Sequence, residues 1–109
     1  NTPNSLVYLN NTSNNTITAG NFSTSATLST GATQQNVSIG DLNGDGSWDA
    51  LAAITGNSIG IYQNLNLVSS SGLNFGTQTP LPITNIAGLE TVDLDNDGRQ
   101  EILYINPAT

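Results

Sequence analysis

Two nine-residue stretches, DLNGDGSWD at residues 41–49 and DLDNDGRQE at residues 93–101, share one pattern. Both read D-x-[DN]-x-D-G-x-x-[DE], and equivalent positions lie 52 residues apart. We call them the first and the second acidic loop. Together they hold seven of the eight acidic residues of the chain, and Glu90 is the eighth. A type of charge that is rare elsewhere in the chain is therefore concentrated at two equivalent places.

The spacing of the acidic residues predicts a calcium site in each loop. Carboxylates that crowd into one tight turn repel one another unless a cation binds between them. Calcium takes about six to eight hard oxygen ligands, and alternating side chains of one loop can supply them. The predicted ligands are the side chains of Asp41, Asn43, Asp45 and Asp49 with the carbonyl of Ser47, and the side chains of Asp93, Asp95, Asp97 and Glu101 with the carbonyl of Arg99.

The loops differ from an EF-hand, which begins with a similar pattern. An EF-hand needs a bidentate Glu at position 12 and helices on both sides, whereas position 12 here is Ala52 or Tyr104. Gly46 and Gly98 occupy position 6, where a sharp turn favours a residue without a Cβ. The alternative to a metal site is an Asp/Asn/Gly turn that binds no ion. A second complete copy at a matching place favours the metal site.

The residues around both loops predict short β-strands. Residues 37–39 and 91–92 precede the loops, and residues 50–54 and 102–105 follow them. The repetition extends further, because NFST at 21–24 matches NFGT at 74–77 and SLVYLN at 5–10 matches IGIYQN at 59–64. The sequence therefore predicts a single all-β domain over residues 1–109, made of two repeats at about 5–56 and 57–106 with about four strands each.

These motifs resemble the FG-GAP/VCBS repeats of integrin-α-type β-propellers. The resemblance rests on NFGT at 74–77, on SIG at 38–40 before Asp41, and on both acidic loops. It implies propeller blades of four antiparallel strands, with calcium in the loop between two of them. The chain departs from the family pattern where Ser23 follows Phe22 in place of Gly, where Asn43 replaces Asp, and where Glu101 replaces Asp.

Two repeats are too few for a ring, because propellers usually have about four to eight blades. We expect other chains or further repeats to complete the ring. The strand predicted at residues 5–9 resembles the one expected after residues 102–105, so the N-terminal strand is expected to complete the last repeat, in the same chain or in a neighbour. Copies of the chain would then form a ring or a filament, according to whether the rotation between subunits closes.

The composition excludes several classes of function. The chain has eight acidic residues, one Arg and no Lys or His, which gives a net charge of −7. Charged residues make up 8% of the chain. One basic residue cannot neutralise a nucleic-acid backbone, and no apolar run is long enough for membrane insertion. Chemistry that needs His, Cys or Lys is absent, and only Glu90 is left for acid–base catalysis once the loops bind metal. The 16 Asn, 14 Thr and 11 Ser are typical of an extracellular or cell-surface protein.

The sequence therefore predicts a non-catalytic, calcium-binding structural or adhesive module that associates with copies of itself. Its further partners would be a glycan or a cell-surface protein. The alternative function is that of a lectin-like propeller, in which Trp48, Tyr8, Tyr62 and Tyr104 stack on sugars. The side chain of Arg99 is expected in solvent, and the alternative is a salt bridge from its guanidinium to Glu90 or to a neighbouring subunit.

Overall fold

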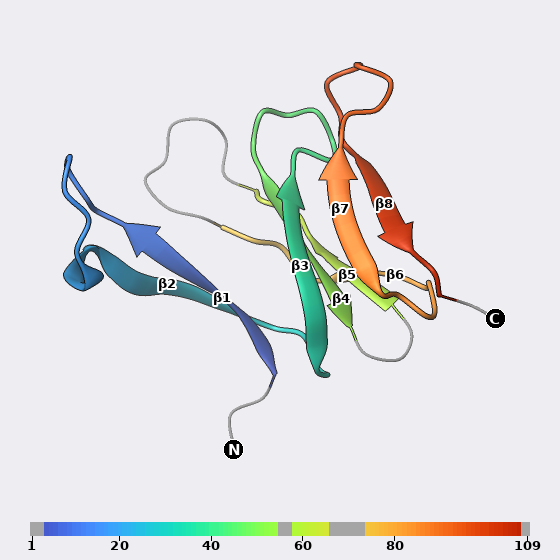
Figure 1. The fold of residues 1–109 in the computed structure, drawn as a ribbon, viewed down its shortest axis with the longest axis horizontal. Helices are drawn as coiled ribbons and strands as arrows, with labels where there is room; N and C mark the ends of the chain where they lie inside the picture. The colour runs from blue at the N-terminus through green and yellow to red at the C-terminus, as the bar shows by residue number, and fades with distance from the viewer. Residues whose placement is uncertain (1–3, 55–57, 66–73, 108–109) are drawn as a thin grey trace.

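The computed structural model describes residues 4–54, 58–65 and 74–107, and these residues are all-β, as predicted (Figure 1). They contain one 3-10 helix and no α-helix, so no described helix could cross a membrane. The elements are β1 (Ser5–Asn11), η1 (Ala19–Asn21), β2 (Phe22–Ser29), β3 (Gln34–Gly40), β4 (Asp49–Ile54), β5 (Ser58–Tyr62), β6 (Thr79–Leu81), β7 (Gly88–Val92) and β8 (Glu101–Ile105).

The strands form three antiparallel sheets, and none of them closes on itself within the described residues. The central sheet has the order β3-β4-β5-β6, and the pairs β1-β2 and β7-β8 form two smaller sheets. Of the two four-stranded sheets expected, the described part of one chain therefore contains one, and β7-β8 has only two strands. A second such sheet would need β1 beside β8, but these strands lie on opposite sides of the central sheet (Figure 1).

Both acidic loops connect neighbouring antiparallel strands, as the flanking sequences predicted. The first loop joins β3 to β4, and Gly40 pairs with Asp49 across its base. The second joins β7 to β8, where Val92 pairs with Glu101. Each loop therefore begins and ends at a cross-strand pair, which brings its first and last acidic residues toward each other.

The apolar core lies between the central sheet and the β7-β8 sheet. It consists of Leu51, Ala53, Ile59 and Leu89, with Ile61 and Ile102 packed against it. Leu51 and Ile59 have no exposed surface. Every residue of β4 is buried, and the strand is paired on both edges, with β3 and with β5.

The opposite face of the central sheet meets the β1-β2 sheet through polar contacts. The hydroxyl of Tyr62 donates a hydrogen bond to the carbonyl of Ser29 at 3.0 Å, and Nε2 of Gln78 donates to the same hydroxyl at 2.6 Å. On the β7 side, the hydroxyls of Ser38 and Thr91 lie 3.0 Å apart. The central sheet is thus held from both sides, and the two acidic loops come to lie near each other.

The second Asn-Phe motif does not begin a regular strand, unlike the first, where β2 begins at Phe22. Phe75 forms an isolated bridge to Asn64, and β6 begins only at Thr79. Pro80 and Pro82 lie in this segment, and proline cannot donate to a strand ladder. β6 is accordingly short and lies at the edge of the sheet.

Candidate metal centre

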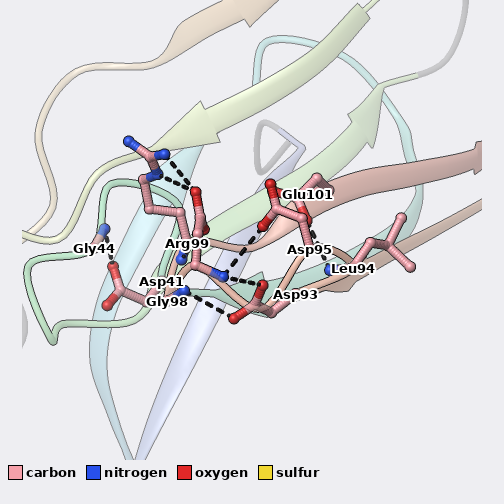
Figure 2. Close-up of polar contacts among 9 residues, drawn as sticks. Asp41, Gly44, Asp93, Leu94, Asp95, Gly98, Arg99 and Glu101 are labelled. Atoms are coloured by element: carbon pink, nitrogen blue, oxygen red, sulfur yellow. Dashed lines mark hydrogen bonds and ion pairs between the residues drawn. The ribbon is translucent and has the colours of Figure 1, made fainter.

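The first acidic loop is shaped by its own side chains. Oδ1 of Asp41 accepts the amide of Gly44 at 2.8 Å (Figure 2). Its Oδ2 accepts the amide of Gly46 at 2.9 Å. Oδ1 of Asp45 accepts the amide of Ser47 at 2.8 Å. Short Asp and Asn side chains favour such bonds to amides two to five residues ahead. Gly44 and Gly46 have φ of +79° and +87°, a region that glycine adopts at little cost.

The second acidic loop repeats this scaffold 52 residues later. Oδ2 of Asp93 accepts the amide of Gly98 at 2.9 Å, and Oδ1 of Asp97 accepts the amide of Arg99 at 2.8 Å. Asn96, at the position of Gly44, also has a positive φ, of 63°. The predicted equivalence of the two loops therefore holds at the level of individual hydrogen bonds.

Three carboxylates of the second loop converge on one point. An oxygen from each of Asp93, Asp95 and Glu101 lies within 4.8 Å of the other two (Figure 2). Among the residues that the structure describes, this is the one such group of three or more acidic, His or Cys side chains. Oε2 of Glu101 also accepts the amide of Leu94 at 2.7 Å, which fixes the carboxylate over the loop.

The corresponding residues of the first loop are arranged differently. Asp49, at the position of Glu101, is only 2% exposed. Its Oδ2 accepts the amide of Leu42 at 3.0 Å, and its Oδ1 accepts the amide of Asn64 at 2.8 Å. Asp49 therefore ties the start of its own loop, through Oδ2, to the chain that follows β5, through Oδ1. The carboxylates of Asp41, Asp45 and Asp49 do not form a group as compact as that of the second loop.

The charges of the second loop act on one another. The pKa of Asp95 is raised, first by desolvation within the loop although the side chain is exposed, and then by the charges of Asp97, Glu101 and Asp93. Hydrogen bonds from Arg99, through its side chain and its amide, lower the pKa of Asp97. The same contact raises the pKa of the Arg99 guanidinium. A cation bound at this loop would offset the repulsion that contributes to the raised pKa of Asp95.

The side chain of Arg99 is largely exposed, as expected, but its guanidinium pairs with Asp97 and not with Glu90. Nε of Arg99 lies 3.0 Å from Oδ2 of Asp97, and Nη2 contacts the same oxygen. Asp97 is therefore held by the basic side chain, and the structure does not bring it into the group of Asp93, Asp95 and Glu101. The pair is exposed, and such pairs exchange readily with solvent ions.

The two acidic loops contact each other through the backbone and one side chain. The amide of Gln100 donates to the carbonyl of Asp41 at 2.8 Å. A Cβ added to Gly44 would lie 3.0 Å from Cγ of Arg99, so the stem of Arg99 packs against the first loop. Neither this contact nor the role of Asn64 was predicted from the sequence. The matching position of Asn64 and Asn10 in the two repeats was the one available signal for Asn64.

The donor set fits calcium. The side chains that converge in the second loop offer only carboxylate oxygens, which hard cations such as Ca²⁺ prefer. In the first loop, Asn43 offers an amide oxygen where the second loop has Asp95, so that loop carries one carboxylate fewer. The carbonyls of Ser47 and Arg99 stay predicted ligands. The loops supply neither a thiolate nor an imidazole for a softer metal.

An apolar groove lies between the β1-β2 sheet and the first two strands of the central sheet. Its volume is about 440 Å³, and its walls include Val7, Val37, Ile39, Trp48 and Ala50. Trp48 is 60% exposed, whereas Tyr62 is 2% exposed. Tyr62 is therefore unavailable for stacking on a sugar, which removes one of the four aromatic residues proposed for glycan binding.

Comparison of the chain with models of protein families, with curated proteins and with solved structures gave no match. The assignment of a function therefore rests on the geometry of the loops and sheets.

Proposed function

We propose that the chain is a non-catalytic, calcium-stabilised structural or adhesive module that acts outside the cell and associates with copies of itself. The observation that carries the proposal is the convergence of Asp93, Asp95 and Glu101 in the second acidic loop. The matching scaffold of the first loop supports a second site of the same kind. The FG-GAP/VCBS resemblance of both loops agrees with this assignment.

Calcium would act on the fold through electrostatics. Folding brings the like charges of each loop together, and a bound Ca²⁺ would neutralise them. A ligand that binds only the folded chain stabilises it by about 2.7 kcal/mol per site at a hundredfold excess over Kd. Because each loop joins the first two strands of a sheet, this stabilisation would reach the pairs β3-β4 and β7-β8.

The remaining surface is suited to self-association. Two Ca²⁺ ions would add four positive charges and bring the formal charge from −7 to −3. Apolar side chains stand exposed at the outer strands, among them Leu103 at 53%, Ile105 at 64% and Val7 at 47%. Exposed apolar surface on strands of small sheets is a feature of interaction sites. The scarcity of charge removes an obstacle to contact between copies.

Isothermal titration of chelator-treated protein with CaCl₂ tests the calcium assignment. We expect two binding events, and we expect Asp95→Asn to weaken the one in the second loop. Glu90→Gln is the matched control, because Glu90 is an exposed acid of β7 outside both loops. No heat of binding with the wild-type chain, or equal weakening by the control, would contradict the assignment.

Light scattering with and without calcium tests the association. We expect a mass above that of one 11.3-kDa chain in saturating calcium. A single species of one-chain mass at high protein concentration would refute the assembly and leave the calcium assignment in place.

A further inference from the structure

The two outer strands β8 and β1 correspond to two strands that pair inside the central sheet. The offset of 52 residues between the loops makes residues 102–105 of β8 equivalent to residues 50–53 of β4. The match of SLVYLN with IGIYQN makes residues 5–8 of β1 equivalent to residues 59–62 of β5. β4 and β5 are antiparallel neighbours. β8 has β7 on one edge and β1 has β2 on one edge, and the other edge of each has no strand partner among the described residues.

Equivalent side chains of β4 and β8 differ sharply in burial. Leu51 and Ala53 of β4 are 0% and 2% exposed, whereas Leu103 and Ile105 of β8 are 53% and 64% exposed. Ile102 of β8 packs against the core, so Leu103 and Ile105, which alternate with Tyr104, point to the opposite face of the β7-β8 sheet. That face has the apolar pattern of a buried face without a covering layer.

The residues that line the apolar groove are equivalent to residues that surround the buried face of β4 in the central core. Leu51 packs in a core with Leu89, and Ile61 packs against the same cluster. The equivalent of Leu89 is Val37, and the equivalent of Ile61 is Val7, and both line the groove. The side chain that would complete this second core is the equivalent of Leu51, which is Leu103. The strand that carries Leu103 lies on the other side of the same molecule (Figure 1).

We propose that β8 of one copy pairs antiparallel with β1 of a second copy, and that Leu103 then fills the partner's groove. The pairing of Leu51 with Ile61 and of Ala52 with Gly60 sets the register. It places Leu103 opposite Val7 of the second copy and Tyr104 opposite Leu6. The sheet β7-β8-β1-β2 that results has four strands, two from each copy.

The contacts of Asp49, the closing acid of the first acidic loop, show which contact Glu101 would gain in the assembly. Asp49 accepts one amide from its own loop, that of Leu42, and one from Asn64 beyond β5. Glu101 accepts the matching loop amide, that of Leu94. In the proposed register, the amide equivalent to that of Asn64 belongs to Asn10 of the second copy. Pairing of β8 with β1 of the second copy would therefore hold Glu101 in place at the second acidic loop. Assembly would in this way be linked to metal binding.

The contact is head-to-tail, because each copy uses β8 toward one neighbour and β1 toward the other. Such contacts continue until a ring closes or a filament grows. This inference rests on the proposed self-association and adds the strands, the register and the side chain that fills the groove.

Disulfide trapping tests the register, and the absence of cysteine from the chain gives it a clean background. Facing residues of antiparallel strands have Cα atoms about 4.5–5.5 Å apart, within the range of about 4.4–6.8 Å that a disulfide spans. We would mix Val7→Cys with Leu103→Cys in calcium under mild oxidation. The expected result is a covalent species of twice the chain mass, and a ladder of higher masses from the double variant. Both side chains are exposed, and circular dichroism checks that the variants fold.

The matched control is Val7→Cys mixed with Tyr104→Cys, because a shift of one residue places the second thiol on the opposite face of the sheet. Light scattering of the wild-type chain separates the two proposals. An assembly that traps the control pair as well as, or better than, Val7→Cys with Leu103→Cys overturns the register and leaves self-association intact. A single chain by light scattering with no trapped species overturns both.

Discussion

The two acidic loops share one pattern of hydrogen bonds, but their closing acidic residues make different contacts. In the first loop the closing acid is buried and uses both oxygens to bind backbone amides, one of them beyond β5. In the second loop the closing acid is longer, more exposed, and grouped with two other carboxylates. The difference teaches that what packs beside a loop decides whether its closing acid is buried against backbone amides or grouped with other carboxylates. The first loop has β5 beside it, whereas no described strand pairs with the matching edge of β8 beside the second loop.

The largest expected effect comes from the closing acids. Asp49→Ala leaves the amides of Leu42 and Asn64 without this acceptor, and each such loss near buried structure costs about 1–3 kcal/mol. We therefore expect a loss of about 3 kcal/mol in the free energy of unfolding. Glu101→Ala removes one amide contact and should cost about 1 kcal/mol. Urea unfolding in chelator measures both, and equal losses would contradict the difference between the loops.

Calcium removal is the next largest perturbation. Saturating Ca²⁺ should raise the unfolding free energy of the wild-type chain by about 2.7 kcal/mol per site at a hundredfold excess over Kd. Thermal unfolding in calcium and in chelator measures the shift. Mg²⁺ at the same concentration is the control, because it dehydrates reluctantly and fits irregular oxygen cages poorly. An unchanged melting temperature in chelator would oppose a structural role for the ion.

A charge exchange between the loops sharpens the comparison further. Asp95→Asn gives the second loop the amide of the first, and Asn43→Asp does the reverse. Without calcium, the first variant should melt higher than wild type and the second lower, because like charges are removed or added. With calcium both orders should reverse, because the ion gains from each added carboxylate. Melting curves of both variants in both conditions check this, and shifts of the same sign in calcium and in chelator would refute it.

A smaller effect is expected at the equivalent positions Gly44 and Asn96, both of which have a positive φ. Gly44→Asn introduces a Cβ that would lie 3.0 Å from Cγ of Arg99, and it should cost about 1 kcal/mol. Asn96→Gly should change the stability by only a few tenths of a kcal/mol, since both residues tolerate this conformation. Chemical unfolding compares the two. The double variant Gly44→Asn with Arg99→Ala should regain part of the loss, and no recovery would show that contact with Arg99 is not the cause.

The smallest effect is expected from the exposed ion pair of the second loop. Arg99→Gln removes the partner of Asp97, and the melting temperature without calcium should change little, because exposed pairs contribute little net stability. Calcium affinity should rise slightly in the same variant, because the released carboxylate of Asp97 becomes available to the ion. Calcium titration detects this, and a lower affinity would show that the Arg99 side chain supports the site.

The local features of the fold followed from the sequence, and the arrangement of the sheets did not. Strand–loop–strand units around residues 41–49 and 93–101 could be predicted, because an Asp/Gly turn between apolar runs fixes the connection locally. The assignment of each strand to a sheet could not be predicted, because the sequences of β1, β4 and β8 all predict short apolar strands. Which strand pairs with which depends on long-range packing of Leu51, Ile59 and Leu89, and sequence spacing does not show it.

In the candidate site, the spacing of the acids predicted the convergence of Asp93, Asp95 and Glu101, but the sequence did not predict the contacts of the neighbouring residues. The alternating acids identified the positions that face the turn. The sequence does not show that Asp97 is held by Arg99, since a two-residue spacing in a loop has no fixed direction. It also does not show that Asp49 is buried against Asn64, which depends on the register of β4 and β5. With these contacts, the carboxylates of the second loop form a more compact group than those of the first.

The position of Arg99 has a practical consequence. It is the one basic residue of the chain, and its side chain is 61% exposed at the tip of the second loop. A protease that cleaves after Arg or Lys therefore has a single target, and its cut separates the segment that carries β8 from the rest of the backbone. The rate of that one cut would report how firmly the loop is held. Limited digestion in rising calcium thus offers a direct assay of this loop that needs neither a label nor a substitution.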